Sequence, residues 1–353
     1  MNAVTSFAPV TCRTADLSNA GECARIEQFV NGHPGSTPFH LPAWSLAVAN
    51  GCGAEVHYLT AEREGAIIAV LPLHAIRSRL FGNALVSAAF AVGGGILGEW
   101  GGLADEALKR AAQLGCPAVE LRGGLLPEGG WVRDGETYVG FCNSLAADDE
   151  AQLLAIPRKQ RAEVRRALGL ELDVTVGRDS DAAERHYRVY AESVRNLGTP
   201  VFPRRLFRQV LEVFGPAADI LTISHKGRPL ASVLSLYHRG VVMPYWGGGV
   251  AEARTWRANE LMYYALMCHA RQEKGCHSFD FGRSKVGTGP AAFKKNFGFT
   301  PEPLYYAKRA LDGAVLRDIN PLSPKYRAQI ALWQKLPLSL ANLVGPWIAR
   351  GLG

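Results

Sequence analysis

Two stretches of this chain, about 160 residues apart, follow the same pattern. Residues 57–74 read HYLTAEREGAIIAVLPLH, and residues 219–238 read DILTISHKGRPLASVLSLYH. A second pair keeps nearly the same offset, because residues 114–120 (LGCPAVE) match residues 274–280 (KGCHSFD), where a helix ends in Gly-Cys and a buried strand ends in a carboxylate. Chance is enough to explain one pair of weakly similar segments. Two such pairs, in the same order and separated by nearly the same number of residues, favour a duplicated domain.

The duplication predicts an α/β protein of two domains, residues 1–150 and 151–310, followed by an amphipathic tail, residues 311–353. A chain of 353 residues suits two domains that each bury a core. Each half is expected to contain helices, a hairpin that turns at Gly65 or Gly227, a further helix and a strand. We therefore predict mixed sheets with helices on their faces.

Composition describes a soluble globular protein, with 48% hydrophobic and 20% charged residues. No run approaches the roughly 18 apolar residues of a membrane span, and the first residues lack the pattern of a secretory signal. We expect a cytoplasmic protein. The seven cysteines are odd in number and form no CxxC pair, which favours free buried thiols over disulfides or zinc. The histidines show no metal spacing, so no metal site is predicted.

The net charge of +7 conceals an asymmetry between the halves. Residues 1–150 hold nine Lys and Arg against sixteen Asp and Glu, whereas residues 151–353 hold thirty against sixteen. A basic half favours an anionic partner such as a phosphate-bearing molecule, a nucleic acid or an acidic membrane face. A solvated arginine-rich surface is the alternative.

Residues 278–289 carry the sharpest chemical pattern. Asp280 alternates with two phenylalanines, which predicts a carboxylate facing away from them at a strand's carboxyl end, where open α/β sheets place their ligands. A buried ion pair with Arg283 is the structural alternative. Gly287 and Gly289 allow backbone N–H groups to approach an anion just before a helix, although glycines also serve turns.

A basic helix is predicted over residues 148–169, interrupted at Pro157. Arg158, Arg161 and Arg165 recur at i, i+3 and i+7 and therefore share one face. The arginine fork suits phosphates, so this face is a candidate site for a tRNA end, a sugar nucleotide or a lipid-linked pyrophosphate. An ordinary solvated face is the alternative.

The run FDFGRS at 279–284 and the run AFKKNFGF at 292–299 resemble the closing segment of the FemAB-type transferases and the related CelD/BcsL-type proteins. The basic helix from residue 156 and the segment ANELM at 258–262 resemble helices of the same families. The likeness extends, as an order of elements, over residues 35–310. It implies tandem acetyltransferase-like (GNAT) domains, each with a mixed, mostly antiparallel sheet, and the transfer of aminoacyl or peptidyl groups.

The resemblance also implies roles for single residues. Lys294 matches a lysine near the acyl-acceptor channel and would stabilise developing negative charge, although a lysine snorkelling beside Phe293 is the alternative. Tyr245 and Trp246 end a strand where GNAT folds admit a substrate, and they line that cleft or cover the core. Asn259 begins the next helix, where capping is the plain explanation.

The segment Arg-Thr-Trp-Arg-Ala-Asn at residues 254–259 departs from the acetyl-CoA-dependent enzymes, because it lacks the glycines of their Arg/Gln-x-x-Gly-x-Gly/Ala loop. The donor therefore stays open between an acyl-CoA and an aminoacyl-tRNA. We expect tRNA rather than DNA if the partner is a nucleic acid.

The C-terminal residues 326–350 are apolar with scattered Lys and Arg and contain Trp333 and Trp347. They predict either an interfacial anchor at the inner face of a membrane or a segment that packs onto the protein or a second copy. Motifs in the tail resemble FemAB-like proteins found with exosortase (PEP-CTERM) and exopolysaccharide gene clusters, at residues 324–327, 333–337 and 345–346.

Two functional hypotheses follow. The first is an acyl- or aminoacyltransferase that forms an amide on an amino sugar or peptide, with Asp280 and Arg283 orienting groups and Lys294 stabilising charge. No residue is assigned as general base. The second is a catalytically silent GNAT-like binding protein of a polysaccharide assembly system.

Overall fold

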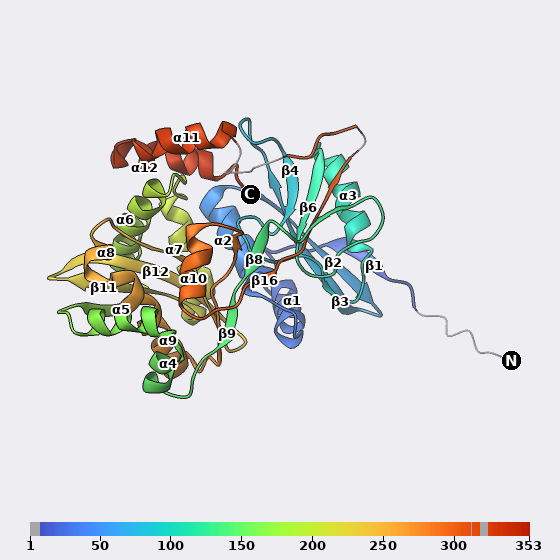
Figure 1. The fold of residues 1–353 in the computed structure, drawn as a ribbon. Helices are drawn as coiled ribbons and strands as arrows, with labels where there is room; N and C mark the ends of the chain where they lie inside the picture. Colours follow the sequence, from blue (N-terminus) through green and yellow to red (C-terminus); the bar gives the residue numbers. More distant parts are fainter. Residues whose placement is uncertain (1–7, 312, 318–323) are drawn as a thin grey trace.

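The computed structural model describes residues 8–311, 313–317 and 324–353, with side chains in the last segment from residue 327 onward. Each half of the chain builds one large sheet, and the two halves lie side by side (Figure 1). Part of the predicted tail, residues 312 and 318–323, lies outside the described residues.

The first sheet has the order β1-β2-β3-β4-β6-β17-β7, with β5 beside β3. Its strands are β1 (Thr11–Thr14), β2 (Glu55–Arg63), β3 (Ala66–Ile76), β4 (Ala84–Ser87), β5 (Leu97–Gly98), β6 (Ala118–Arg122), β7 (Val132–Asp134) and β17 (Tyr306–Ala310). The helices of this half are α1 (Ala20–Gly32), the short η1 (Pro38–His40), α2 (Pro42–Cys52) and α3 (Leu103–Gln113).

The second sheet has the order β10-β11-β12-β13-β14-β9, and a small third sheet has the order β15-β8-β16. The strands are β8 (Tyr138–Gly140), β9 (Cys142–Ser144), β10 (Asp173–Gly177), β11 (Ala218–His225), β12 (Arg228–His238), β13 (Val241–Gly249), β14 (Ser278–Asp280), β15 (Ser284–Lys285) and β16 (Glu302–Pro303). The helices are α4 (Asp149–Ala155), α5 (Arg158–Leu168), α6 (Ser180–Asn196), α7 (Arg204–Phe214), η2 (Gly215–Ala217), α8 (Ala253–Trp256), α9 (Ala258–Lys274), α10 (Gly289–Asn296), α11 (Pro324–Gln334) and α12 (Leu338–Ala349).

The two halves repeat one topology, which confirms the predicted duplication. In each half a hairpin turns through two residues with positive φ, first Glu64 and Gly65 (51° and 78°) and then Lys226 and Gly227 (49° and 77°). This conformation matches the turn to the twist of the strands. Both hairpins also have a register shift at the same distance before the turn.

The second pair of similar segments, residues 114–120 and 274–280, also has the same structure in both halves. Gly115 and Gly275 follow α3 and α9 with φ of 64° and 63°, which allows the left-handed turn that ends a helix. The next residues, Cys116 and Cys276, donate their backbone N–H groups back to the helix and then lead into β6 and β14. In each half this last strand runs parallel to the fourth strand, β4 or β13.

Two strands cross between the halves. The sequence predicts one strand over residues 136–145 in the first half and a closing strand over residues 303–309 in the second. Instead, residues 136–145 form β8 and β9, and β9 pairs with β14 at the edge of the second sheet. In turn, β17 pairs with β6 and β7 of the first sheet. Strands β8, β9 and β16 pass between the halves (Figure 1).

A continuous apolar core joins the halves. It contains Trp44 and Phe90 from the first half and Phe207 and Trp246 from the second, all at most 7% exposed. The equivalent helices α2 and α7 pack directly on one another. An interface of this kind holds the two halves in one fixed arrangement.

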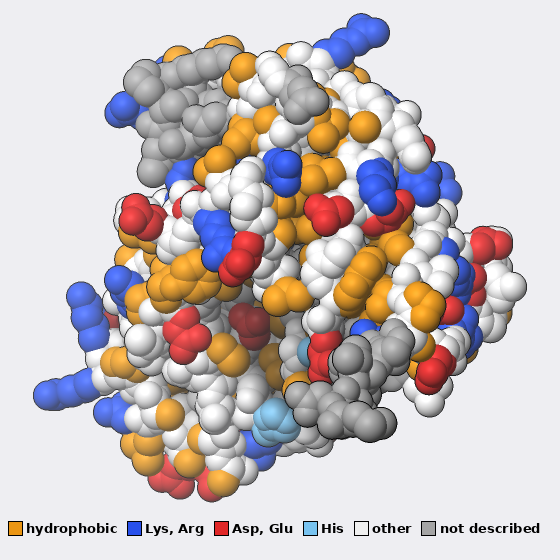
Figure 2. Space-filling view, turned by 90° about the vertical axis from the view of Figure 1, so that its right-hand side faces the viewer, with side chains coloured by type: hydrophobic (Ala, Val, Ile, Leu, Met, Phe, Trp, Pro, Cys, Tyr) orange, Lys and Arg blue, Asp and Glu red, His pale blue; other side chains and the backbone are white. Residues whose placement is uncertain are grey.

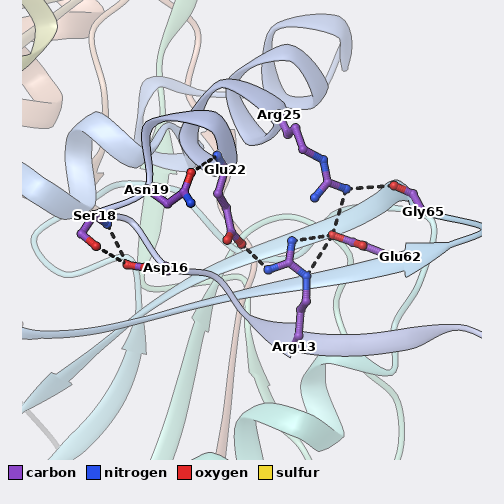
Figure 3. A network of polar contacts seen from close by, with 8 residues as sticks. All are labelled: Arg13, Asp16, Ser18, Asn19, Glu22, Arg25, Glu62 and Gly65. Atoms are coloured by element: carbon purple, nitrogen blue, oxygen red, sulfur yellow. Dashed lines mark hydrogen bonds and ion pairs between the residues drawn. The ribbon is translucent and has the colours of Figure 1, made fainter.

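The outer edge of the first sheet is fastened by ion pairs. Arg13 of β1 bonds Glu62 of β2 at 2.7 Å and also bonds Glu22 of α1 (Figure 3). Arg25 of α1 bonds the same Glu62 carboxylate at 3.1 Å and the carbonyl oxygen of Gly65 at 2.8 Å. This network connects the edge strand, the helix above it and the hairpin turn.

The surface and the cysteines refine two expectations. Figure 2 shows acidic and basic side chains interspersed with apolar ones on the side that the first half forms, so its acidic excess does not gather into one field there. All seven cysteines are free, but they are not all buried, because Cys142 on the edge strand β9 is exposed.

Candidate functional site

Strands β13 and β14 separate after two paired positions. Val241 pairs with Ser278 and Val242 with Phe279, and β13 then continues to Gly249 paired with β12 but no longer with β14. Beyond this point β13 contains a bulge in which Tyr245 is the extra residue opposite β12. Parallel strands that diverge at their carboxyl ends are the usual place for a ligand in an α/β sheet, and bulges often lie beside such sites.

Asp280 lies where β14 ends. Its Oδ1 accepts a hydrogen bond from the backbone N–H of Gly282 at 2.8 Å. Burial raises the pKa of the Asp280 carboxyl above its ordinary value, although the Gly282 hydrogen bond and the nearby Lys294 act in the opposite direction. Asp280 is therefore a better proton acceptor than an exposed aspartate.

The equivalent carboxylate of the first half, Glu120, has a different environment. It is buried and bonds Arg317 at 2.6 Å, with Lys308 at 3.8 Å. Burial raises its pKa, but the hydrogen bond and charge of Arg317 together with the charges of Lys308 and Arg122 outweigh that effect, and the pKa of Glu120 lies below its usual value. The first copy thus holds a structural ion pair.

Lys294 reaches inward from α10 to the same turn. Its Nζ donates hydrogen bonds to the carbonyl oxygens of Gly282 and Arg283 at 3.1 and 3.0 Å, and the residue is 9% exposed. The ammonium also lies 5.3 Å from the ring centre of Phe141. Burial lowers the pKa of Lys294 to about 8. The snorkelling alternative is therefore wrong, because the charged end is buried.

Arg283 belongs to a cluster of tyrosines at the seam between the halves. Its guanidinium lies 4.9 Å from the ring centre of Tyr138 and donates to the hydroxyl of Tyr306 at 3.2 Å. Burial lowers the pKa of Arg283, whereas the phenol groups of Tyr306, Tyr138 and Tyr245 raise it. Their combined effect is larger than that of burial, so the pKa of Arg283 lies above its usual value. The structural alternative, an ion pair between Arg283 and Asp280, is not found among the described residues, and Arg283 makes these contacts instead.

The structure brings Asp280, Arg283 and Lys294 together around one turn. Sequence reasoning missed Tyr138 and Tyr306, because they come from β8 and β17 and no local pattern connects them with the turn. Only the crossing of these strands between the halves places them there.

Tyr245 and Trp246 pack into the shared core. Trp246 is 5% exposed, and the Tyr245 hydroxyl donates to the carbonyl oxygen of Phe90. The Tyr245 ring lies 5.0 Å from Phe39 and 5.3 Å from Trp44, measured between ring centres. Of the two alternatives for this pair, lining a cleft or covering the core, the burial of Trp246 supports the core, because the neighbouring half covers this face of β13.

Asn259 lies in the first turn of α9, next to the glycines of β13. A Cβ atom at Gly249 would be 2.7 Å from the Asn259 side-chain oxygen, and that oxygen has no hydrogen-bond partner among the described residues. The capping explanation is not supported, since the N-cap position is Arg257.

The remaining predicted residues lie before α10 and on α5. Gly287, with φ of 77°, forms the turn before α10, and α10 begins at Gly289. On α5, Arg158 and Arg165 are exposed, and Arg161 is half-buried and donates to the carbonyl oxygen of Leu154. Whether these groups bind phosphate stays a prediction.

Helix α5 packs against the start of α9. Its Glu163 carboxylate is shared by Arg166, at 2.7 Å, and by Arg257. Arg257 has φ of 55° and holds the N-cap of α9, where an acetyl-CoA-dependent enzyme carries a glycine-rich loop. The ion pair between Arg257 and Glu163 therefore lies at the N-terminus of α9.

Two cavities lie outside the turn. One of about 280 Å³ is at the seam and is lined by Met243 and by Ser36 and His238, whose Oγ and Nε2 atoms are 2.9 Å apart. The other, of about 510 Å³, lies between the end of β3 and α12. Neither was expected from the sequence.

Comparison with known proteins identifies the fold. Residues 157–295 match the family model described as an acetyltransferase (GNAT) domain. The crystal structure of FemX is similar, with a TM-score of 0.66 and 13% identity, and the match covers 82% of this chain and 96% of FemX. A search among curated proteins gave no match.

Two further structures agree with this result. A tandem GNAT protein from the clavulanic acid biosynthesis pathway, solved without AcCoA, has a TM-score of 0.57 and 12% identity, covering 87% of this chain and all of that one. L-PGS from Bacillus licheniformis has a TM-score of 0.55 and 14% identity, covering 93% and 97%. The chain therefore has a tandem GNAT fold, and the match to the family model lies in its second half.

Proposed function

We propose that this protein is an acyl- or aminoacyltransferase that forms an amide on an amine acceptor, with its site where β13 and β14 diverge. The observation that carries the proposal is the convergence of Asp280 and Lys294 on one turn at the carboxyl end of β14. This turn lies in the half that matches a GNAT acetyltransferase domain.

The proposed reaction uses both residues. Asp280, whose pKa burial raises, accepts a proton from the acceptor ammonium and leaves a neutral amine. The amine attacks the carbonyl carbon of a donor ester or thioester, and a C–N bond forms. Lys294 stabilises the negative charge on the carbonyl oxygen. The intermediate collapses as the C–O or C–S bond breaks, and the leaving group takes up the proton that the attacking nitrogen releases. Arg283 positions the turn.

An aminoacyl ester, such as an aminoacyl-tRNA, is the favoured donor. The Arg257–Glu163 pair stands where the glycine-rich loop for coenzyme A would lie, so the usual pyrophosphate cradle is lacking there. Helix α5, which carries the exposed Arg158 and Arg165, packs on α9, and these arginines would contact donor phosphates. An acyl-CoA bound in another manner is the second donor.

The acceptor class follows from the resemblance of the sequence to FemAB-type proteins. We propose an amino sugar or peptide of a cell-envelope polymer or exopolysaccharide, modified at the cytoplasmic side. The association with exosortase systems rests on the tail motifs and stays a prediction.

The test is turnover of defined mixtures, followed by mass spectrometry of the acceptor. Wild-type protein is incubated with acetyl-CoA or charged tRNA and with amino-sugar or peptide amines. Lys294→Ala and Asp280→Asn are each expected to lower turnover by about a hundredfold or more. Lys295→Ala is the matched control, because Lys295 is the exposed neighbour on the same helix. Full turnover in both site variants would exclude this mechanism.

A catalytically silent binding protein is the second candidate. The observation in its favour is the loss of the coenzyme A loop at the start of α9. Binding of tRNA, coenzyme A or a sugar nucleotide in a thermal-shift assay, with no product on any acceptor, would support this candidate.

A further inference from the structure

Helix α12 packs with its smallest residues inward. Ala341, Gly345 and Ala349 recur every fourth residue, and all three are buried. Gly345 contacts the backbone at Val201, since a Cβ on this glycine would lie 3.1 Å from the Val201 nitrogen. The helix rests against α6 at the top of the molecule (Figure 1).

The opposite face of α12 is apolar and exposed. Leu340, Leu343 and Trp347 recur at i, i+3 and i+7 and are 43%, 77% and 62% exposed. A helix at the surface of a soluble domain normally buries its large apolar residues and exposes polar ones. The reversed arrangement of α12 indicates that a partner covers its outer face.

Arginines lie beside the Trp347 end of this apolar stripe. Residues 324–353 contain four Lys and Arg and no acidic residue. Arg350 of the tail lines the 510 Å³ cavity together with Trp347, and the cavity's other wall includes Arg77 and Arg79. The next residue of that wall, Leu80, is 54% exposed.

One acidic residue lies in the lining of this cavity. Glu55 also lines the cavity, and its carboxylate is engaged by His57 at 3.1 Å and by Arg77 at 3.5 Å. Two segments far apart in sequence, the loop after β3 and the end of the tail, thus form one surface of exposed leucine and tryptophan bordered by arginine. We name this surface the α12 face.

We propose that the α12 face docks onto a lipid bilayer that contains anionic phospholipids. Leu340 and Leu343 would enter the acyl boundary, Trp347 would lie at headgroup level, and the arginines would contact lipid phosphates. None of the helices in the described part of the chain is both long and apolar enough to cross a bilayer. In this proposal the 12-residue α12 lies along the bilayer surface. The proposal does not depend on the transferase activity.

The test is flotation of the full chain with vesicles of phosphatidylcholine alone or with about one third phosphatidylglycerol. Wild-type protein is expected to float with the anionic vesicles and much less with the neutral ones. The double variant Leu343→Ser/Trp347→Ser is expected to bind at least tenfold more weakly, and Arg77→Gln/Arg79→Gln is expected to lose the preference for anionic lipid. Leu125→Ser, which alters an exposed leucine of the first half, is the control.

Thermal unfolding of each variant shows whether the fold is intact, which is expected because the altered side chains are exposed. Equal flotation of the wild type and the Leu343→Ser/Trp347→Ser variant would overturn the proposal. It would also be overturned if the wild type fails to float and sediments as a dimer that this variant dissociates, because the occupant would then be a second copy.

Discussion

At the scale of single residues, burial sets the charges at the turn after β14. Desolvation raises the pKa of Asp280 and lowers that of Lys294, so the two groups approach one another in proton affinity. Groups with this property are suited to proton transfer near neutral pH. In the first half, Arg317 holds the equivalent Glu120 in its charged form, and the pKa of Glu120 lies below its usual value.

The pKa of Lys294 predicts how turnover depends on pH. With a pKa near 8, the side chain is an ammonium below this pH and a neutral amine above it. If the ammonium stabilises negative charge, turnover falls as pH rises through about 8. The arginine of the Lys294→Arg variant stays charged over this whole pH range. The residual activity of this variant should therefore not fall at alkaline pH. Rates measured between pH 6 and 10 test this, and an unchanged alkaline fall in the variant would assign it to another group.

At the scale of elements, the crossing of α2 and α7 is set by one glycine. A Cβ on Gly51 would lie 2.5 Å from the Cα of Leu206, so any larger residue forces the helices apart. The contact is between backbones, which cannot give way as a flexible side chain can.

We predict that Gly51→Val lowers the free energy of unfolding by about 2–3 kcal/mol through overpacking. Gly32→Val on α1 is the matched control, because nothing lies within 4 Å of a Cβ at that position. Urea unfolding of both variants measures the difference. Equal stability of the two would show that α2 and α7 can separate at little cost.

At the scale of the whole molecule, the crossing strands tie the halves together. Strand β9 completes the second sheet from before residue 150, and β17 completes the first sheet from beyond residue 303. A fragment that follows the predicted boundaries, residues 151–310, therefore lacks an edge strand of its own sheet and carries a strand of the other.

Fragment 136–303 contains β8, β9 and the rest of the second sheet and is nearly the same size. We predict that it unfolds more cooperatively and at a higher temperature than fragment 151–310, although both expose the face that packs on α2. Calorimetry of the two fragments measures their unfolding temperatures and the cooperativity of unfolding. A more stable fragment 151–310 would mean that β9 adds nothing to its sheet.

Much of this architecture is determined by short segments of the sequence. The paired turns at Gly65 and Gly227, the helix ends at Gly115 and Gly275 and the alternation of β14 depend on neighbouring residues, so pattern alone predicts the repeated elements. The nearness of Asp280, Arg283 and Lys294 follows as well, because one strand, one loop and one helix connect them.

Tertiary structure alone decided the rest. The exchange of β9 and β17, the tyrosines around Arg283, the burial of Trp246 and the outward apolar face of α12 depend on which distant surfaces meet. Residues such as Tyr138 and Tyr306 carry no local signal of that meeting, because pairing across the seam is selected by the burial of the whole core and not by any short segment.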